Sequence, residues 1–341
     1  MTMAQSLPSS EPASASVFPR SIHLTGQGQP RTGLTLRDVN DIIAKRDGYL
    51  WVDVDTNDAS QVELFKGIKD LHPLSIDDVL NRKSRPKLEE YPNYLFMVIL
   101  GLRLHEETDD PYDLETFDLC FFLGPRFLVT AHAGASTSID EVATRIEKSP
   151  DLLTRGVDRL TQAIMDGAVD AYFPLLDQID EFIDGLEQRV VERFDQSALP
   201  EIFAVKRLTI SLRRHIGPER EVFNILTNRP SALLSSESQL YFRDIYDHVL
   251  RINDSVETFR DLLSSVLDSY LTQVSNRLGR VTKGLSVIAT LSIPFVVVSG
   301  MWGMNVPVPF ATHHGAFWWM LAVQIALGLI LLLILRFRNF L

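Results

Sequence analysis

The sequence predicts an α/β cytoplasmic domain, a long helical stalk and two C-terminal transmembrane helices, and three observations support this fold class. Strand-like apolar runs occur between residues 48 and 150 and stop there. Proline is absent from residues 235 to 293, where apolar residues recur at spacings of four and three. Residues 284–335 contain no Lys, Arg, Asp or Glu. Such a long run without ionised side chains is typical of membrane spans.

Residues 1–35 are rich in Ser, Pro, Gly and Gln and lack the apolar stretch of a signal peptide, which predicts a disordered cytoplasmic tail. Residues 36–150 should form the α/β domain. Its expected strands are Tyr49–Val54, Tyr94–Leu102, Phe117–Leu123 and Phe127–Ala131, and its expected helices are Ala59–Leu71 and Pro73–Asn81. Gly124 and Pro125 predict a hairpin turn. Cys120, the single cysteine, should lie in the core and excludes an internal disulfide.

Residues 151–234 should form an antiparallel helical hairpin, with one amphipathic helix over Val157–Phe194 and a second from Pro200 to about Asn228. Residues 235–283 should be the cytoplasmic part of the stalk. Its apolar seam comprises Ile245, Val249, Ile252, Val256, Phe259, Leu263, Val266 and Tyr270. This heptad spacing predicts lengthwise packing on a partner or on copies of the same helix. The helix should continue into the membrane, for about 65 residues and roughly 100 Å.

The uncharged run is long enough for two spans, at residues 284–304 and 317–335, joined by an outer loop at 305–316 and followed by a basic tail at 336–341. Basic residues flank the spans and are absent from the loop, so both termini should face the cytoplasm across an inner (plasma) membrane. We expect a basic belt of Arg280, Lys283, Arg336 and Arg338 at the cytoplasmic membrane face. Simple topological anchoring is the alternative reading of these four residues.

The first span is richer in small and weakly polar residues than the second, which indicates that the first span lines a pore. These residues are Thr290, Ser292, Ser299, Gly300 and Gly303. Close helix packing is the alternative explanation of the small side chains.

The net charge is −11, and the five ionised side chains after residue 273 are all basic, so the first 273 residues carry about −16 by subtraction. This acidic balance favours partners that are cations and argues against nucleic acid, although acidity also serves solubility. No phosphate-binding loop is present, so coupling to ATP is not expected. No nucleophile–base pair is recognisable in the α/β domain, so neither an enzyme nor an organic cofactor is expected.

Gly303, Met304 and Asn305 stand at the outer end of the first span, with the second span and a basic tail after them. This arrangement resembles the CorA family of magnesium channels, whose hallmark is Gly-Met-Asn in that place. The likeness extends to Tyr241–His248, Val256–Asp261, Ser275–Arg277, and the early segment His72–Leu74 with Asp77, Asp78 and Asn81. It covers nearly everything after the N-terminal tail.

The resemblance implies a funnel-shaped homopentamer in the lipid bilayer that moves Mg2+, with Co2+ or Ni2+ as further candidates, into the cytoplasm. It implies that Gly303, Met304 and Asn305 form the selectivity filter, and that Asp78 and Asp244 bind regulatory Mg2+ between subunits. The implied pore-lining residues are Thr282, Leu285, Ala289, Ile293, Val296 and Gly300.

Two departures from the family pattern leave alternatives open. Gly279 stands where relatives often carry Asn at the cytoplasmic pore entrance, and the outer loop lacks the Glu that many relatives have. The loop instead carries His313 and His314, which are either solvated or indicate a preference for softer ions. A Zn2+ transporter of the ZntB type is therefore the second hypothesis, although that signature more often has Ile or Val at the position of Met304. A membrane-anchored sensor is a third, from another class.

Overall fold

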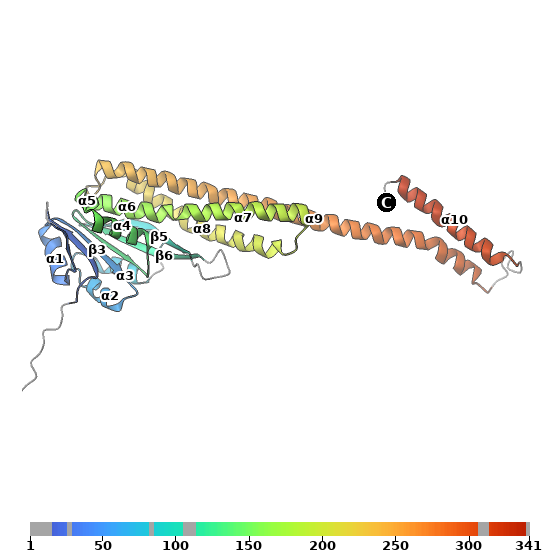
Figure 1. Cartoon of the computed structure of the whole chain (residues 1–341), viewed down its shortest axis with the longest axis horizontal. Helices are drawn as coiled ribbons and strands as arrows, with labels where there is room; N and C mark the ends of the chain where they lie inside the picture. Colours follow the sequence, from blue (N-terminus) through green and yellow to red (C-terminus); the bar gives the residue numbers. More distant parts are fainter. Residues whose placement is uncertain (1–15, 26–28, 82–84, 105–113, 306–313, 339–341) are drawn as a thin grey trace, which may run out of the picture. The chain divides into compact units, whose positions relative to one another are not determined.

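The computed structural model describes residues 16–25, 29–81, 85–104, 114–305 and 314–338 (Figure 1). The chain divides into two compact units, one formed by residues 1–185 and 200–264 and the other by residues 186–199 and 265–341. The first unit contains the sheet, and the second contains the two apolar helical segments near the C-terminus.

The first unit is built on a seven-stranded sheet with the strand order β2-β1-β3-β7-β6-β5-β4. Its strands are β1 (Arg20–Leu24), β2 (Arg31–Thr32), β3 (Tyr49–Asp55), β4 (Lys87–Glu90), β5 (Leu95–Leu104), β6 (Leu114–Leu123) and β7 (Phe127–His132). β3 and β7 run parallel, and the other neighbours are antiparallel. The predicted hairpin is confirmed, because β6 and β7 pair across a turn in which the Gly124 N–H donates to the Phe127 carbonyl at 2.8 Å.

Helices cover both faces of this sheet. These helices are α1 (Leu36–Lys45), α2 (Ala59–Lys66), α3 (Pro73–Asn81), α4 (Thr137–Lys148), α5 (Asp151–Thr154) and α6 (Val157–Asp170). One apolar cluster joins α1, α2 and α3 to the face that carries Val52 and Phe122, and α6 packs on β3, β5, β6 and β7. Cys120 belongs to that cluster and is 1% exposed, so its predicted place in the core is confirmed.

The predicted disordered tail is too long. The described residues from Ser16 onward, 16–25 and 29–35, belong to the α/β domain, because Phe18 is fully buried and β1 forms five register pairs with β3. Thr35 and Asp38 then close a capping box at the start of α1. The apolar side chains of Ile22 and Leu24 supply the burial that the surrounding composition conceals. Residues 1–15 lie outside the described residues.

The single helix expected over Val157–Phe194 is also wrong. The structure has α6, ending at Asp170, and a separate helix α7 (Tyr172–Arg193). Pro174 explains the break, because its ring nitrogen cannot donate a hydrogen bond to the Asp170 carbonyl. After the connection 194–197 the chain continues as α8 (Ala198–Asn228).

The predicted stalk is one continuous helix, α9 (Ser236–Trp302), of 67 residues. All eight residues of its predicted seam are buried within the chain, from Ile245 (0% exposed) to Tyr270 (7%). Further along, Val274 (38%) and Leu278 (66%) are exposed. The second apolar helix is α10 (Ala316–Phe337), which still includes Arg336 of the expected tail. α9 and α10 are the two described helices that are long and apolar enough to cross a membrane.

Candidate ion pathway and cation-binding groups

The predicted filter directly follows the last residue of α9. The Gly303 N–H donates to the Ser299 carbonyl at 2.9 Å, and the Met304 N–H donates to the Met301 carbonyl at 3.5 Å. A Cβ on residue 303 would lie 3.2 Å from the Ser299 carbonyl oxygen, a close contact that glycine avoids. Met304 and Asn305 follow with exposed side chains.

The six predicted pore-lining residues are all exposed in the single chain. Leu285 (65%), Ile293 (56%) and Val296 (69%) are the large apolar members of this line. The partly or fully buried positions of the same segment are Val287, Thr290, Leu291, Pro294, Val298 and Trp302. At 3.6 residues per turn these two lines lie on nearly opposite sides of α9. α10 therefore covers one side of the first span, and the predicted pore line is left open.

The groups expected near the membrane faces are exposed. Arg280 and Lys283 lie on α9, and Arg336 lies in the last turn of α10 with Arg338 just after it. A Cβ on Gly279 would have nothing within 4 Å, so its backbone stands in open space and it offers no polar side chain. His314 is exposed, and His313 lies outside the described residues.

The two predicted regulatory carboxylates have different surroundings. Asp78 on α3 accepts a hydrogen bond from Lys87 Nζ at 2.6 Å, and Lys87 also contacts Glu89 at 2.7 Å. Burial works to lower the pKa of Lys87, but its bonds to these two carboxylates outweigh burial and raise it. Asp78 is thus already paired with a basic residue of its own chain. Asp244 lies exposed on α9.

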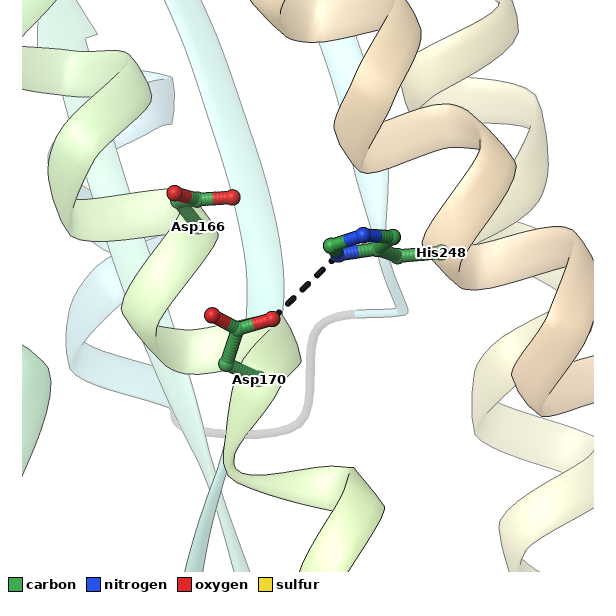
Figure 2. A group of neighbouring side chains, drawn as sticks. All are labelled: Asp166, Asp170 and His248. Carbon is green, nitrogen blue, oxygen red and sulfur yellow. Dashed lines mark ion pairs between the residues drawn. The ribbon is translucent and has the colours of Figure 1, made fainter.

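Three further side chains form a cluster that the sequence did not reveal (Figure 2). Asp166 and Asp170 lie one turn apart on α6 and face His248 on α9, and one ligand atom from each lies within 4.8 Å of the others. Nδ1 of His248 lies 3.2 Å from Oδ1 of Asp170 but makes no hydrogen bond of good geometry. The rings of Phe173 and His248 form a T-shaped pair with 5.4 Å between their centres. Two carboxylates and an imidazole are ligands that divalent metals accept.

The electrostatics of this cluster favour a cation. Burial raises the pKa of Asp166, and the neighbouring charges of Asp170 and Asp244 raise it further. Like charges held this close repel, and a divalent ion between them removes the repulsion. Asp244 stands four residues before His248 on α9, so the predicted regulatory residue adds its charge to the cluster. In the sequence, only the spacing of four between Asp166 and Asp170 could have indicated this cluster, because His248 lies 78 residues after Asp170.

A separate polar group lies where the parallel strands β3 and β7 end, in a cavity of about 460 Å³. The buried Asp53 carboxylate contacts Arg20 at 3.3 Å, Thr130 Oγ1 at 2.6 Å and His132 Nε2 at 3.2 Å. Burial works to lower the pKa of His132, but the bond and charge of Asp53 outweigh it and raise the pKa. The Gly134 carbonyl contacts the other ring nitrogen of this histidine. These groups satisfy one another and point to no ligand.

A domain of mixed α/β structure followed by two helices that are long and apolar enough to cross a membrane, α9 and α10, is typical of a membrane protein with paired C-terminal spans. A sequence profile of the family described as CorA-like Mg2+ transporter protein matches residues 46–336. The chain therefore belongs to the CorA family of magnesium transporters, which is a transporter family and not an enzyme family.

Named relatives agree with this assignment. The chain is 35% identical to the cobalt/magnesium transport protein CorA of Thermotoga maritima, over 79% of this chain and 77% of the relative. It is 34% identical to the putative metal ion transporter YfjQ of Bacillus subtilis, over 75% and 78% of the two chains.

Solved structures share the fold. The CorA magnesium transporter of Methanocaldococcus jannaschii matches with a TM-score of 0.79 at 18% identity, over 93% of this chain and 97% of that one. The cytoplasmic domain of ZntB from Vibrio parahaemolyticus matches with a TM-score of 0.54 at 18% identity, over 67% and 88%. The recognised family and the predicted combination of an α/β domain, a long helix and two apolar C-terminal helices are thus confirmed.

Proposed function

We propose that this chain forms a homopentameric channel in the inner membrane that moves Mg2+ into the cytoplasm, with both termini on the cytoplasmic side. One observation supports this most strongly. The Gly303–Asn305 segment ends a helix whose predicted pore line is exposed along its whole length, while the opposite side packs on α10. A helix exposed in this way suits copies of itself arranged around a common axis.

Asn305 is the proposed contact with the ion. Mg2+ is small, prefers octahedral oxygen ligands and releases its water slowly. A ring of amide oxygens at the pore mouth binds the water shell without removing it. Gly303 permits the tight helix end that presents Asn305, and Met304 lies between them.

The membrane potential supplies the driving force. A doubly charged ion that moves inward gains about 4.6 kcal/mol per 100 mV, so no nucleotide is needed. The pore instead needs a gate, and Leu285 and Ile293 are apolar residues that close a narrow pore by dewetting. A basic belt anchors the two spans at the cytoplasmic membrane face. It consists of Arg280, Lys283, Arg336 and Arg338.

Regulatory Mg2+ binds between subunits at Asp78 and Asp244 and favours the closed state. Asp78 must then exchange its contact with Lys87 for the ion, which carries twice the charge of the lysine. Within the subunit, Asp166, Asp170 and His248 offer a second set of ligands beside Asp244. Loss of both ions leaves carboxylates that repel and shifts the population toward open states.

A Zn2+ transporter is the second candidate, and the imidazole of His248 beside two carboxylates favours it. Imidazole suits Zn2+, Ni2+ and Co2+ better than Mg2+. The fold match to a ZntB cytoplasmic domain is consistent with either ion.

The test is uptake of Mg2+, Co2+, Ni2+ and Zn2+, singly and in competition, by liposomes that contain the purified chain. Mg2+ should enter and the other ions should compete. Asn305→Ala should abolish uptake while oligomers still assemble, and Asn228→Ala, which removes an exposed amide at the end of α8, should leave uptake unchanged. Uptake of Zn2+ but not Mg2+ would establish the second candidate, and normal Mg2+ uptake by Asn305→Ala would exclude the proposed filter.

A further inference from the structure

The second span carries one strongly polar side chain, Gln324, in a sequence otherwise dominated by Leu, Ile, Ala and Val. Among the described residues of α10 it is also the one that is buried, at 4% exposure. An amide side chain exposed to lipid hydrocarbon is energetically costly unless it has a hydrogen-bond partner. The partner is Ser299 of the first span, whose Oγ accepts a hydrogen bond from Gln324 Nε2 at 2.8 Å.

The contact lies on a seam between the two antiparallel spans. Five of the less exposed positions of α10 recur at spacings of four and three, namely Met320, Gln324, Gly328, Leu331 and Leu335, and the others, Ala316, Leu321 and Val323, lie beside them on the same face. One turn from the hydrogen bond, the ring of Phe295 on α9 lies 3.5 Å from where a Cβ on Gly328 would be. Gln324 on α10 therefore contacts Ser299 on α9, and Gly328 one turn further along lies against Phe295. The hydrogen bond fixes the register of this seam.

Ser299 differs from other hydroxyl residues of the first span. Thr290 and Ser292 donate to carbonyls of their own helix, at Ser286 and Ile288, both at 2.8 Å. The Ser299 hydroxyl instead accepts from the second span. Its carbonyl accepts the Gly303 N–H at 2.9 Å. One residue thus joins the second span to the first residue of the Gly303–Asn305 segment.

We infer that Gln324 is a positioning residue that holds the Gly303–Asn305 segment in place through Ser299, so that discrimination between divalent cations depends on a hydrogen bond between the spans. The inference rests on the proposed filter. Ser299 lies next to Gly300 of the predicted pore line, and successive residues are about 100° apart around a helix, so Ser299 itself does not face the ion.

The test compares Gln324→Met, which keeps the volume but loses the hydrogen bond, with Ser299→Ala and with the double variant. Ser292→Ala is the matched control, because it removes a hydroxyl bonded within its own helix. The first readout is hydrogen–deuterium exchange of the Gly303 amide in nanodiscs. The second is the ratio of Mg2+ to Co2+ uptake by liposomes.

Both single variants should speed exchange at Gly303 by about threefold, the factor that a typical hydrogen bond between membrane helices supplies, and should change the uptake ratio similarly. The double variant should add nothing further, and exchange in residues 284–292 should stay unchanged. Exchange at Gly303 equal to that of Ser292→Ala in both single variants would overturn the inference. Ser299→Ala decides the matter if Gln324→Met does not insert. If the unaltered chain carries no Mg2+, that result refutes the proposed function, and the exchange measurement at Gly303 still tests the inference about Gln324.

Discussion

Glu219 on α8 is a buried carboxyl group of the first unit that has no ion pair within the described part of the chain, and it should make stability depend on pH. It is 1% exposed, and its Oε1 accepts the Leu100 N–H at 2.6 Å. Leu100 lies on β5 beyond Val98, the last β5 residue that pairs with β4, so Glu219 caps a free strand edge. Its Oε2 has no hydrogen-bond partner among the described residues. Burial outweighs the bond to Leu100 and raises the pKa of Glu219 to about 8.

The sign of the effect follows from this shift. Between the unfolded pKa of 4.5 and the folded pKa of about 8, the folded state binds more protons than the unfolded state, so stability falls as pH rises through this window. Each pKa unit corresponds to about 1.4 kcal/mol, so the full loss is about 5 kcal/mol. Gln keeps the acceptor for Leu100 and never ionises. Glu219→Gln should therefore remove this loss and be more stable than the unaltered chain above pH 8.

Urea unfolding of the full chain in detergent, read by pulse proteolysis at pH 5, 6.5 and 8.5, measures the effect. Glu221→Gln is the matched control, because Glu221 is exposed on the same helix. The unaltered chain and the control should lose stability across this range, and Glu219→Gln should lose much less. An equal loss in Glu219→Gln would refute a buried neutral carboxyl group at this position.

Three further outcomes follow from the α/β domain. Gly48→Ala should lower the free energy of unfolding by at least about 2 kcal/mol, because residue 48 has a φ of +65° and a Cβ there would clash with the Leu24 carbonyl. Urea unfolding measures this change, and an unchanged unfolding midpoint would contradict it. Cys120 should resist maleimide in the folded chain and react after denaturation, since it is buried and burial raises the pKa of its thiol; rapid labelling of the folded chain would place it elsewhere. Asp53→Asn should destabilise the folded chain by about 3 kcal/mol, and by more at pH 6 than at pH 9. The reason is that the contribution of charged His132 to stability is complete below pH 6.5 and disappears as pH rises through its raised pKa. A pH-independent cost would show that His132 is neutral.

The sequence predicted those elements whose signal is periodic over many residues. The eight seam positions of α9 predicted a long packed helix and the uncharged run predicted two apolar helices, and the structure has both. β1 was missed because its five residues stand among Ser, Pro and Gly, and only pairing with β3 shows their role. The break at Ala171 was missed because an amphipathic period continues past it, although Pro174 was a visible signal.

The candidate site divides in the same way. Gly303, Met304 and Asn305 are contiguous, so a motif reveals them. Asp166 and His248 are far apart in the sequence and meet only because α6 and α9 pack together. Gln324 is a single polar residue within an apolar run, and its meaning depends on Ser299 across the seam.

Uptake of Mg2+ by sealed liposomes that contain only this purified chain, under an imposed membrane potential and without nucleotide, tests the central claim most directly. The account predicts uptake that rises as the interior is made more negative and that Asn305→Ala abolishes. No uptake at any potential, or uptake that does not respond to the potential, would contradict it.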